Sequence, residues 1–281
     1  DDEHMPEDHP MSLTFDSPRS ISALKKHADQ LRDSNPEMRQ HEALNRAAAL
    51  AGHSNYKHAQ RHLPDVMRLL TIRVRWRSDT SSGVESLAYP FPWNAEEVLA
   101  MKLRAVRVAA TWASGPQALT HSTIADSSYS ARVWAVQCVR ELMFMEATGL
   151  RPNFISRVLP RKRFSFMGET GYEHVTPPGE DHLTGWRCPS SKTVVLLDEP
   201  YHGSDDHQSA ERLKWLHDYG YTQGKSAWGG TYLPTDTFMI VLVKNGGALQ
   251  LDDVESKIRG LPDDFGVEGE HWNCLLYTSD A

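Results

Sequence analysis

The chain has 281 residues, of which 40% are hydrophobic and 24% are charged, and its formal net charge is −7. These values are typical of a globular protein, and a net negative charge argues against a surface coated throughout for nucleic acid. No apolar run approaches the roughly 20 residues that span a bilayer, and the acidic first ten residues lack the pattern of a signal peptide, so we expect no membrane partner.

The charge is distributed unevenly along the chain. Residues 1–18 contain six acidic residues and no Lys or Arg, whereas residues 19–77 contain twelve Lys or Arg against five Asp or Glu, a balance of +7. The remaining residues, 78–281, have a balance of −8. We therefore expect a disordered acidic arm over residues 1–19, followed by a basic front section.

Residues 20–64 are expected to form a module of three short helices. Ser20 or Ser17 can cap the first helix, and Asn35-Pro36 separates it from the second. The second helix is rich in alanine and ends at Gly52, a good left-handed stop. Pro64 closes the third.

After Pro64 the period of the apolar residues changes from helical to alternating. Apolar and polar residues alternate over Leu70–Trp76, which predicts a half-buried strand with arginines on its outer face. A second strand over Val84–Ala88 would complete a hairpin, and Pro90 and Pro92 are expected to end it.

Two helices are expected next. Asn94 and Glu97 have the spacing of a capping box, which predicts a helix that runs to about Val108. A Ser-rich loop follows, and then a long helix over Ser128–Thr148 that stops at Gly149.

The rest of the chain reads as a second set of strands and helices. Residues 151–182 show no clear period and are expected to form a long loop that could include a short strand. The later elements expected are a hairpin over Trp186–Cys188 and Lys192–Asp198, a helix over Asp205–Asp218, a strand over Thr237–Val243 and a helix over Asp252–Ile258. The order predicts an α+β protein: the small N-terminal three-helix module is followed, over residues 65–273, by a mixed or antiparallel sheet domain with packed helices.

Both ends of the sequence carry an expectation of their own. Met5 or Met11 is a possible start of the natural protein. The last eight residues, Cys274–Ala281, resemble a translated adapter of the kind used to prepare sequencing libraries, so we expect a non-native tail there. The alternative is a natural edge strand.

Several stretches resemble a bacterial family of unknown function that is met in plasmid and mobile-element gene sets. They are Ala23–Lys26 with Asn55–Gln60, Phe144–Pro152, Asp198–Tyr201 and Trp228–Tyr232. The resemblance implies a bacterial, cytoplasmic protein. It implies no activity, cofactor or catalytic residue.

The basic front section leads to our first functional hypothesis, a binding protein that contacts nucleic acid or another protein. Asymmetric charge of this kind can serve polyanion binding, although an acidic part of the same chain could also neutralise it. The candidate residues are Lys25, Lys26, Arg39, Arg46, Lys57 and Arg61 on the helices and Arg73, Arg75 and Arg77 on the first strand. A second basic run, Arg161–Arg163, is a solvated loop or a further contact.

A charged cluster at the end of an apolar strand gives the alternative, a small hydrolase-like enzyme. Glu199, Tyr201 and His202 follow the run Val194–Leu197, and His182 precedes the partner strand. A carboxylate and a histidine brought together can act as acid and base. The structural alternative is a polar turn that leaves a buried strand.

No motif predicts a metal or a cofactor. The three cysteines share no motif spacing, and the chain has no phosphate-binding glycine loop. His58 and His62 share a helix face, but a structural zinc site almost always needs four ligands. A structural or interaction protein remains the third reading, and the oligomeric state stays open.

Overall fold

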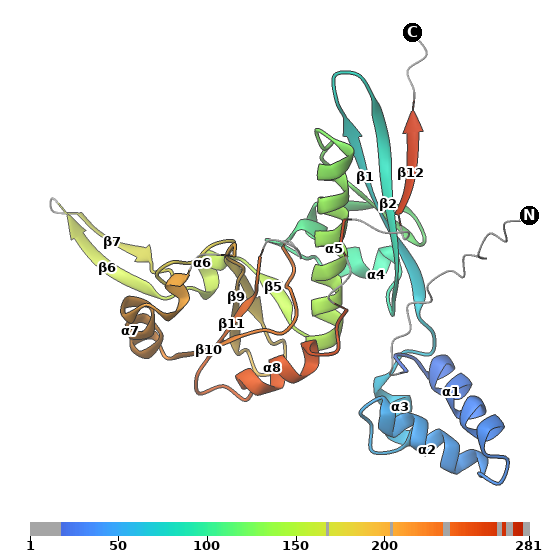
Figure 1. Ribbon diagram of the computed structural model, residues 1–281. Helices are drawn as coiled ribbons and strands as arrows, with labels where there is room; N and C mark the ends of the chain where they lie inside the picture. The colour runs from blue at the N-terminus through green and yellow to red at the C-terminus, as the bar shows by residue number, and fades with distance from the viewer. Residues whose placement is uncertain are drawn as a thin grey trace, which may run out of the picture. The chain divides into compact units, whose positions relative to one another are not determined.

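The computed structural model describes residues 18–166, 169–202, 205–232, 237–262, 266–267 and 272–277 (Figure 1). Contacts divide the chain into two units, Asp1–Met67 and Arg68–Ala281, which we call the N-terminal unit and the main unit. The chain combines helices with sheets that are antiparallel or mixed, so the predicted α+β class is confirmed.

The N-terminal unit consists of the three expected helices, α1 (Ile21–Ser34), α2 (Gln40–Leu50) and α3 (Tyr56–His62). The hydroxyl of Ser20 accepts the backbone N–H of Ala23, which is the predicted cap. The apolar faces of the helices meet in a small core formed by Ile21, Leu24, Ala28, Met38, Ala43, Ala47, Ala48 and Ala59. Because most of these side chains are alanines, the helices can approach closely but bury little apolar area.

The first sheet of the main unit has the strand order β12-β2-β1-β4-β3. Its strands are β1 (Arg68–Arg77), β2 (Ser82–Phe91), β3 (Thr111–Gly115), β4 (Ala118–His121) and β12 (Trp272–Tyr277). The expected hairpin is present, since β1 and β2 pair antiparallel along their whole length, while β1 and β4 pair parallel. Pro90 lies inside β2 and does not end it. Within the described residues β12 reaches only to Leu87, so Pro90 of β2 lies beyond this pairing, where a missing N–H is tolerated.

The segment between β2 and β4 differs from expectation. The Asn94–Glu97 capping box is present, but the helix it opens, α4, covers only Ala95–Ala100. A 3₁₀ turn, η1 (Arg107–Ala110), follows, and β3 and β4 replace the expected Ser-rich loop. The backbone leaves the helical conformation directly after α4, since Lys102 and Ala105 have φ values of +51° and +62°. The carboxylate of Glu141 then accepts the backbone N–H groups at the start of η1.

The long helix α5 (Ser128–Thr148) is confirmed, with Gly149 in the left-handed conformation at its end. It lies along β1 and β2 (Figure 1). Its last turns also reach the second sheet, where the ring of Phe144 is 4.8 Å from that of Trp186. Every residue from Val136 to Met145 is buried, including Arg140 and Glu141, because α5 is covered from both sides. Among the described residues, no helix has both the length and the apolar character needed to cross a membrane.

The second sheet has the order β10-β11-β9-β8-β5 and is antiparallel. Its strands are β5 (Arg151–Asn153), β8 (Thr184–Arg187), β9 (Val194–Asp198), β10 (Tyr221–Lys225) and β11 (Ile240–Lys244), and its helices are α7 (Ala210–Tyr219) and α8 (Leu251–Ile258), with a 3₁₀ turn η2 (Asp205–Gln208) before α7. The apolar run Val194–Leu197 occupies the central strand, as expected. The mostly polar strand β10 was not predicted, because it lies at the edge and buries only Tyr221.

Residues 151–182 are not one long loop. They contain a short helix, α6 (Ile155–Val158), and a separate hairpin of β6 (Arg161–Phe166) and β7 (Glu169–His174), in addition to β5. The basic run Arg161–Arg163 therefore lies on a strand and is exposed. This hairpin is formed by pairing between β6 and β7, which the local pattern of apolar residues does not predict.

The expected tail lies partly in β12. The backbone of Trp272–Tyr277 pairs antiparallel with β2, which is the edge-strand arrangement considered as the alternative. An open sheet edge can pair with any extended segment, so the pairing is compatible with both origins of the tail. The adapter origin of Cys274–Ala281 stays a prediction.

Candidate functional site

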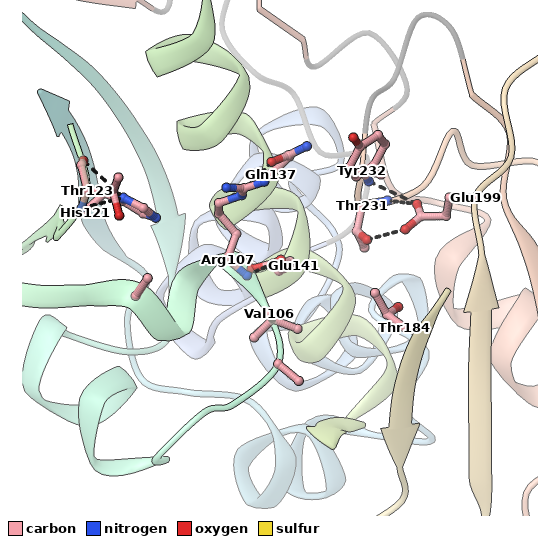
Figure 2. Close-up of a pocket in the computed structure, with 12 residues that line it drawn as sticks. Val106, Arg107, His121, Thr123, Gln137, Glu141, Thr184, Glu199, Thr231 and Tyr232 are labelled. Carbon is pink, nitrogen blue, oxygen red and sulfur yellow. Dashed lines mark hydrogen bonds between the residues drawn. The ribbon is translucent and has the colours of Figure 1, made fainter. Parts of the chain in front are cut away.

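The main unit contains a cavity of about 420 Å³ with polar walls (Figure 2). Its lining comes from the segment before and within η1, from the end of β4, from α5, from β8 and from the loops after β9 and β10. The polar residues in its wall are Arg107, His121, Thr123, Gln137, Glu141, Thr184, Glu199, Thr231 and Tyr232. Its size lies within the range of about 300–1,000 Å³ that small-molecule sites occupy.

Glu141 is a buried carboxylate in the wall that α5 contributes. It accepts the backbone N–H groups of Arg107 at 2.6 Å and of Val108 at 2.7 Å. Burial raises the pKa of Glu141 to about 7, against the lowering effect of these two hydrogen bonds and of the Arg107 charge. One turn earlier on the same helix face, Gln137 accepts the Nε–H of Arg107 at 2.8 Å. Two polar side chains of α5 thus position Arg107 at the cavity.

Glu199 is a second buried carboxylate, on the opposite side of the cavity (Figure 2). It accepts the backbone N–H and the hydroxyl of Thr231, and the backbone N–H of Tyr232 at 3.1 Å. Burial raises the pKa of Glu199, and these hydrogen bonds oppose the rise. The loop passes so close that a Cβ at Gly230, whose φ is +93°, would collide with the carboxylate, which explains why glycine is needed there.

His121 lies at the end of β4 and is only 3% exposed. Its Nδ1 lies 3.2 Å from the backbone nitrogen of Thr123 and 3.3 Å from its carbonyl oxygen. Its Nε2 is buried and has no hydrogen-bond partner among the described residues. Burial lowers the pKa of His121, and Arg107 adds to the effect. Both His121 and Arg107 contact the ring of Trp134, each at 5.1 Å.

The structure brings only part of the predicted Glu199 cluster together. The Nδ1 of His182 is 3.3 Å from the backbone carbonyl oxygen of Glu199, and the His182 ring stacks on that of Tyr232. Tyr201 is 44% exposed, and His202 is exposed with its ring beside Phe238. Neither His182 nor His202 lines the cavity that Glu199 lines.

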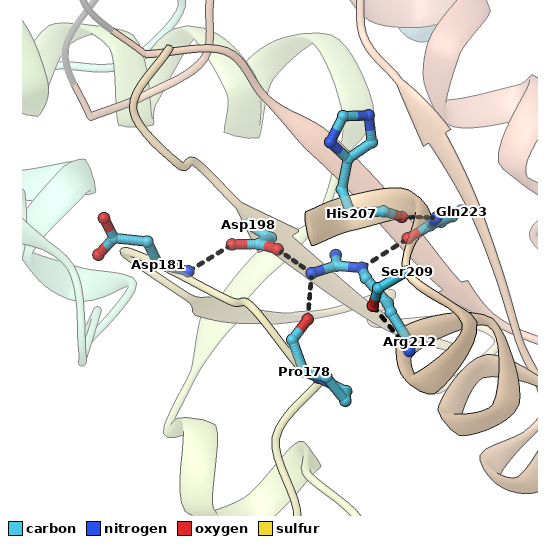
Figure 3. Close-up of polar contacts among 7 residues, drawn as sticks. All are labelled: Pro178, Asp181, Asp198, His207, Ser209, Arg212 and Gln223. Carbon is cyan, nitrogen blue, oxygen red and sulfur yellow. Dashed lines mark hydrogen bonds and ion pairs between the residues drawn. The ribbon is translucent and has the colours of Figure 1, made fainter. Parts of the chain in front are cut away.

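Asp198, the residue before Glu199, forms a buried ion pair and does not line the cavity (Figure 3). Asp198 is fully buried and pairs with Nη1 of Arg212, from α7, at 2.7 Å. Asp198 also accepts the backbone N–H of Asp181, and Arg212 donates from Nε to Gln223 at 2.9 Å. Successive strand residues point to opposite faces, so Asp198 faces α7 while Glu199 faces the cavity. The Asp198–Arg212 pair is a structural tie between sheet and helix.

The three strand arginines lie where the sequence predicts. Arg73, Arg75 and Arg77 are exposed, while the alternate residues of β1 are buried. Their partners across β2 are Ser86, Val84 and Ser82, so no carboxylate stands opposite them. The acidic residue of this part of β2, Glu85, is buried on the other face, where it pairs with Arg132 of α5 at 2.9 Å. The paired strand β2 therefore supplies no negative charge opposite this row of guanidinium groups.

The helical candidates belong to the N-terminal unit. Lys25, Lys26, Arg39, Arg46, Lys57 and Arg61 are all exposed. Arg46 forms an ion pair with Glu42 at 2.9 Å, one turn away on α2. Each unit therefore presents exposed basic side chains of its own.

Histidines gather at α3 more closely than the sequence suggests. The ring of His58 lies 4.4 Å from that of His62 and 5.2 Å from that of His53. Within the part of the chain that the structure describes, no group of three or more His, Cys, Asp or Glu residues is arranged to hold a metal ion.

The sequence interpretation missed most of the cavity. Glu141, Gln137, Arg107 and His121 were not among its candidates. A signal was present, because Gln137 and Glu141 are polar residues one turn apart in the mostly apolar stretch Val133–Met145 of this helix. Such residues are rarely buried without a partner, so their position is informative. Comparisons with protein-family models, with curated proteins and with solved structures found no match to this chain.

Proposed function

We propose that this protein is a cytoplasmic accessory protein of a bacterial mobile element that binds nucleic acid through the arginine row of β1. The observation that supports this function best is the exposure of Arg73, Arg75 and Arg77 on one sheet face without an opposing carboxylate. The bacterial and mobile-element setting rests on the family resemblance alone.

The spacing of the row suits an extended polyanion. Alternate residues on a strand are about 7 Å apart, close to the separation of successive phosphates in an extended single strand. Arginine also binds phosphate in a bidentate manner, which lysine cannot do. We therefore favour single-stranded nucleic acid as the ligand of this face, with the basic side chains of the N-terminal unit as additional contacts.

The test is the binding of a labelled single-stranded oligonucleotide, measured by fluorescence anisotropy over a salt series. The logarithm of the affinity should fall linearly with the logarithm of the salt concentration, and changing Arg73, Arg75 and Arg77 together to Ala should reduce the slope by about 2. A matched triple change on the N-terminal unit, K25A with K57A and R61A, separates its contribution. An unchanged slope in the strand variant, or no binding at low salt, would refute the proposal.

A hydrolase-like reaction at Glu199 and His202 is not carried forward. The Glu199 carboxylate is held by Thr231 and Tyr232, and His202 is outside the cavity. A general acid and a general base must both lie within hydrogen-bonding distance of the reacting atoms of one substrate. The separation of Glu199 from His202 does not allow this.

A further inference from the structure

The cavity has an unequal distribution of hydrogen-bonding groups. Its two carboxylates are occupied, because Glu141 accepts two backbone N–H groups and Glu199 accepts three donors. The groups left without a partner among the described residues are donors. They are the outer guanidinium nitrogens of Arg107, the side-chain amide nitrogen of Gln137 and the Nε2 of His121.

These donors come from three elements that line the same cavity. Arg107 opens η1, Gln137 lies on α5 and His121 ends β4, and the ring of Trp134 touches both Arg107 and His121. In the tautomer in which His121 Nδ1 accepts the Thr123 N–H, Nε2 carries the proton and is a donor. A buried donor without a partner destabilises the folded protein, and an acceptor on a ligand would supply the missing hydrogen bond.

We propose that the cavity binds a small hydroxylated oxyanion, whose carboxylate or phosphate group is held by Arg107, His121 and Gln137. The hydroxyl groups of such a ligand would face the opposite wall, where the hydroxyl oxygens of Thr184 and Thr231 can still accept a hydrogen bond. A guanidinium beside neutral donors is a typical oxyanion site. This site is separate from the β1 arginine row and does not depend on nucleic-acid binding.

A cationic ligand is the competing occupant, since two carboxylates line the same cavity. The geometry argues against it, because both carboxylates already accept internal hydrogen bonds and Arg107 would repel a second cation. The distinction can be measured directly with small probes of different charge.

The experiment is isothermal titration calorimetry on the full chain with four probes: glycerol 3-phosphate, glycerate, glycerol and ethanolamine. We expect saturable binding of at least one of the first two, which distinguishes phosphate from carboxylate recognition, and none of glycerol or ethanolamine. No saturable binding of either anion, or binding of ethanolamine instead, would overturn the proposal.

The variants test the donors. Gln137→Glu keeps an acceptor for the Arg107 Nε–H but replaces the free amide donor by a negative oxygen, so it should weaken anion binding by about tenfold or more. His121→Phe keeps a ring against Trp134 and removes the donor, and it should also weaken binding. Arg187→Ala, at an exposed position of β8, is the control and should leave the affinity unchanged. Anion affinities that are equal in Q137E and in the control would exclude this site, and thermal midpoints would confirm that each variant is folded.

Discussion

At the scale of single residues, the buried carboxylates carry the most physical information. Glu141 lies inside the protein with a raised pKa, yet it holds two backbone N–H groups that would otherwise be unpaired. Burial of Glu141 is therefore unfavourable because the charge loses its hydration, and favourable because two backbone N–H groups gain a hydrogen-bond acceptor. The same two effects act on Glu199 at the loop of Gly230.

Glu141 predicts a pH dependence of stability. Its pKa rises from 4.5 to about 7 on folding, so the folded state holds a proton that the unfolded state has lost between these values. The stabilisation that protonated Glu141 gives the folded state is fully present below pH 4.5 and is lost as the pH rises to about 7. This loss lowers the free energy of unfolding by about 3 kcal/mol. Urea unfolding at several pH values should show that Glu141→Gln removes this part of the slope.

The control for this measurement is Glu96→Gln, at an exposed position of α4. That variant should keep the slope of the unchanged protein. Parallel curves for Glu141→Gln and the unchanged protein across pH 4.5–7 would contradict the assignment. The amide also loses one of the two backbone hydrogen bonds, so a constant offset of about 1 kcal/mol is expected at low pH.

At the scale of elements, one buried ion pair fastens α7 to the central strand of the second sheet. Asp198 and Arg212 are both fully buried, and Arg212 also reaches Gln223 and the carbonyl oxygen of Pro178. Burial raises the pKa of Asp198, whereas the Asp181 N–H and the Arg212 charge lower it. The pair stabilises the packing of α7 on the sheet, and removal of either side chain would leave the other charge buried without a counter-charge.

Removing Arg212 should therefore be costly. We expect Arg212→Met to lower the free energy of unfolding by about 3–5 kcal/mol, because Asp198 stays buried without its partner. The double change with Asp198→Asn should recover part of the loss, since the charge is then absent. Arg187→Met, exposed on β8, should change stability by no more than about 0.5 kcal/mol. A loss below about 1 kcal/mol for Arg212→Met in chemical denaturation would show that the pair is not a stabilising tie.

At the scale of the whole molecule, the division at Met67 predicts where proteases cut. The backbone N–H groups of Ile21 and Ser22 bond to the carbonyl oxygens of Pro64 and Asp65, which binds these two residues to the helical unit. Val66, in contrast, is 48% exposed and precedes β1. Thermolysin, which cleaves before apolar residues, should cut first at Val66 or Met67, with fragments identified by mass spectrometry. Protection of this segment, together with one cooperative thermal transition, would indicate a single folding unit.

Local signals in the sequence determined the elements that depend on local physics. The cap at Ser20, the capping box at Asn94 and the stop at Gly149 follow from hydrogen bonds within a few residues, and all three are confirmed. The alternation in β1 likewise predicts its exposed arginines, since strand side chains alternate between faces.

Tertiary structure alone decided the rest. The helix after Asn94 ends at Ala100 and not near Val108, and Glu141, 34 residues after Arg107, accepts the N–H groups of Arg107 and Val108. The cavity combines donors from β4, η1 and α5 with carboxylates from α5 and from the loop after β9, and these segments lie far apart in the chain. The sequence specifies which polar and charged side chains are present. Whether such a side chain is buried, and which partners it contacts, depends on long-range packing. Burial and partners together decide whether its pKa is shifted or a donor is left without a hydrogen bond.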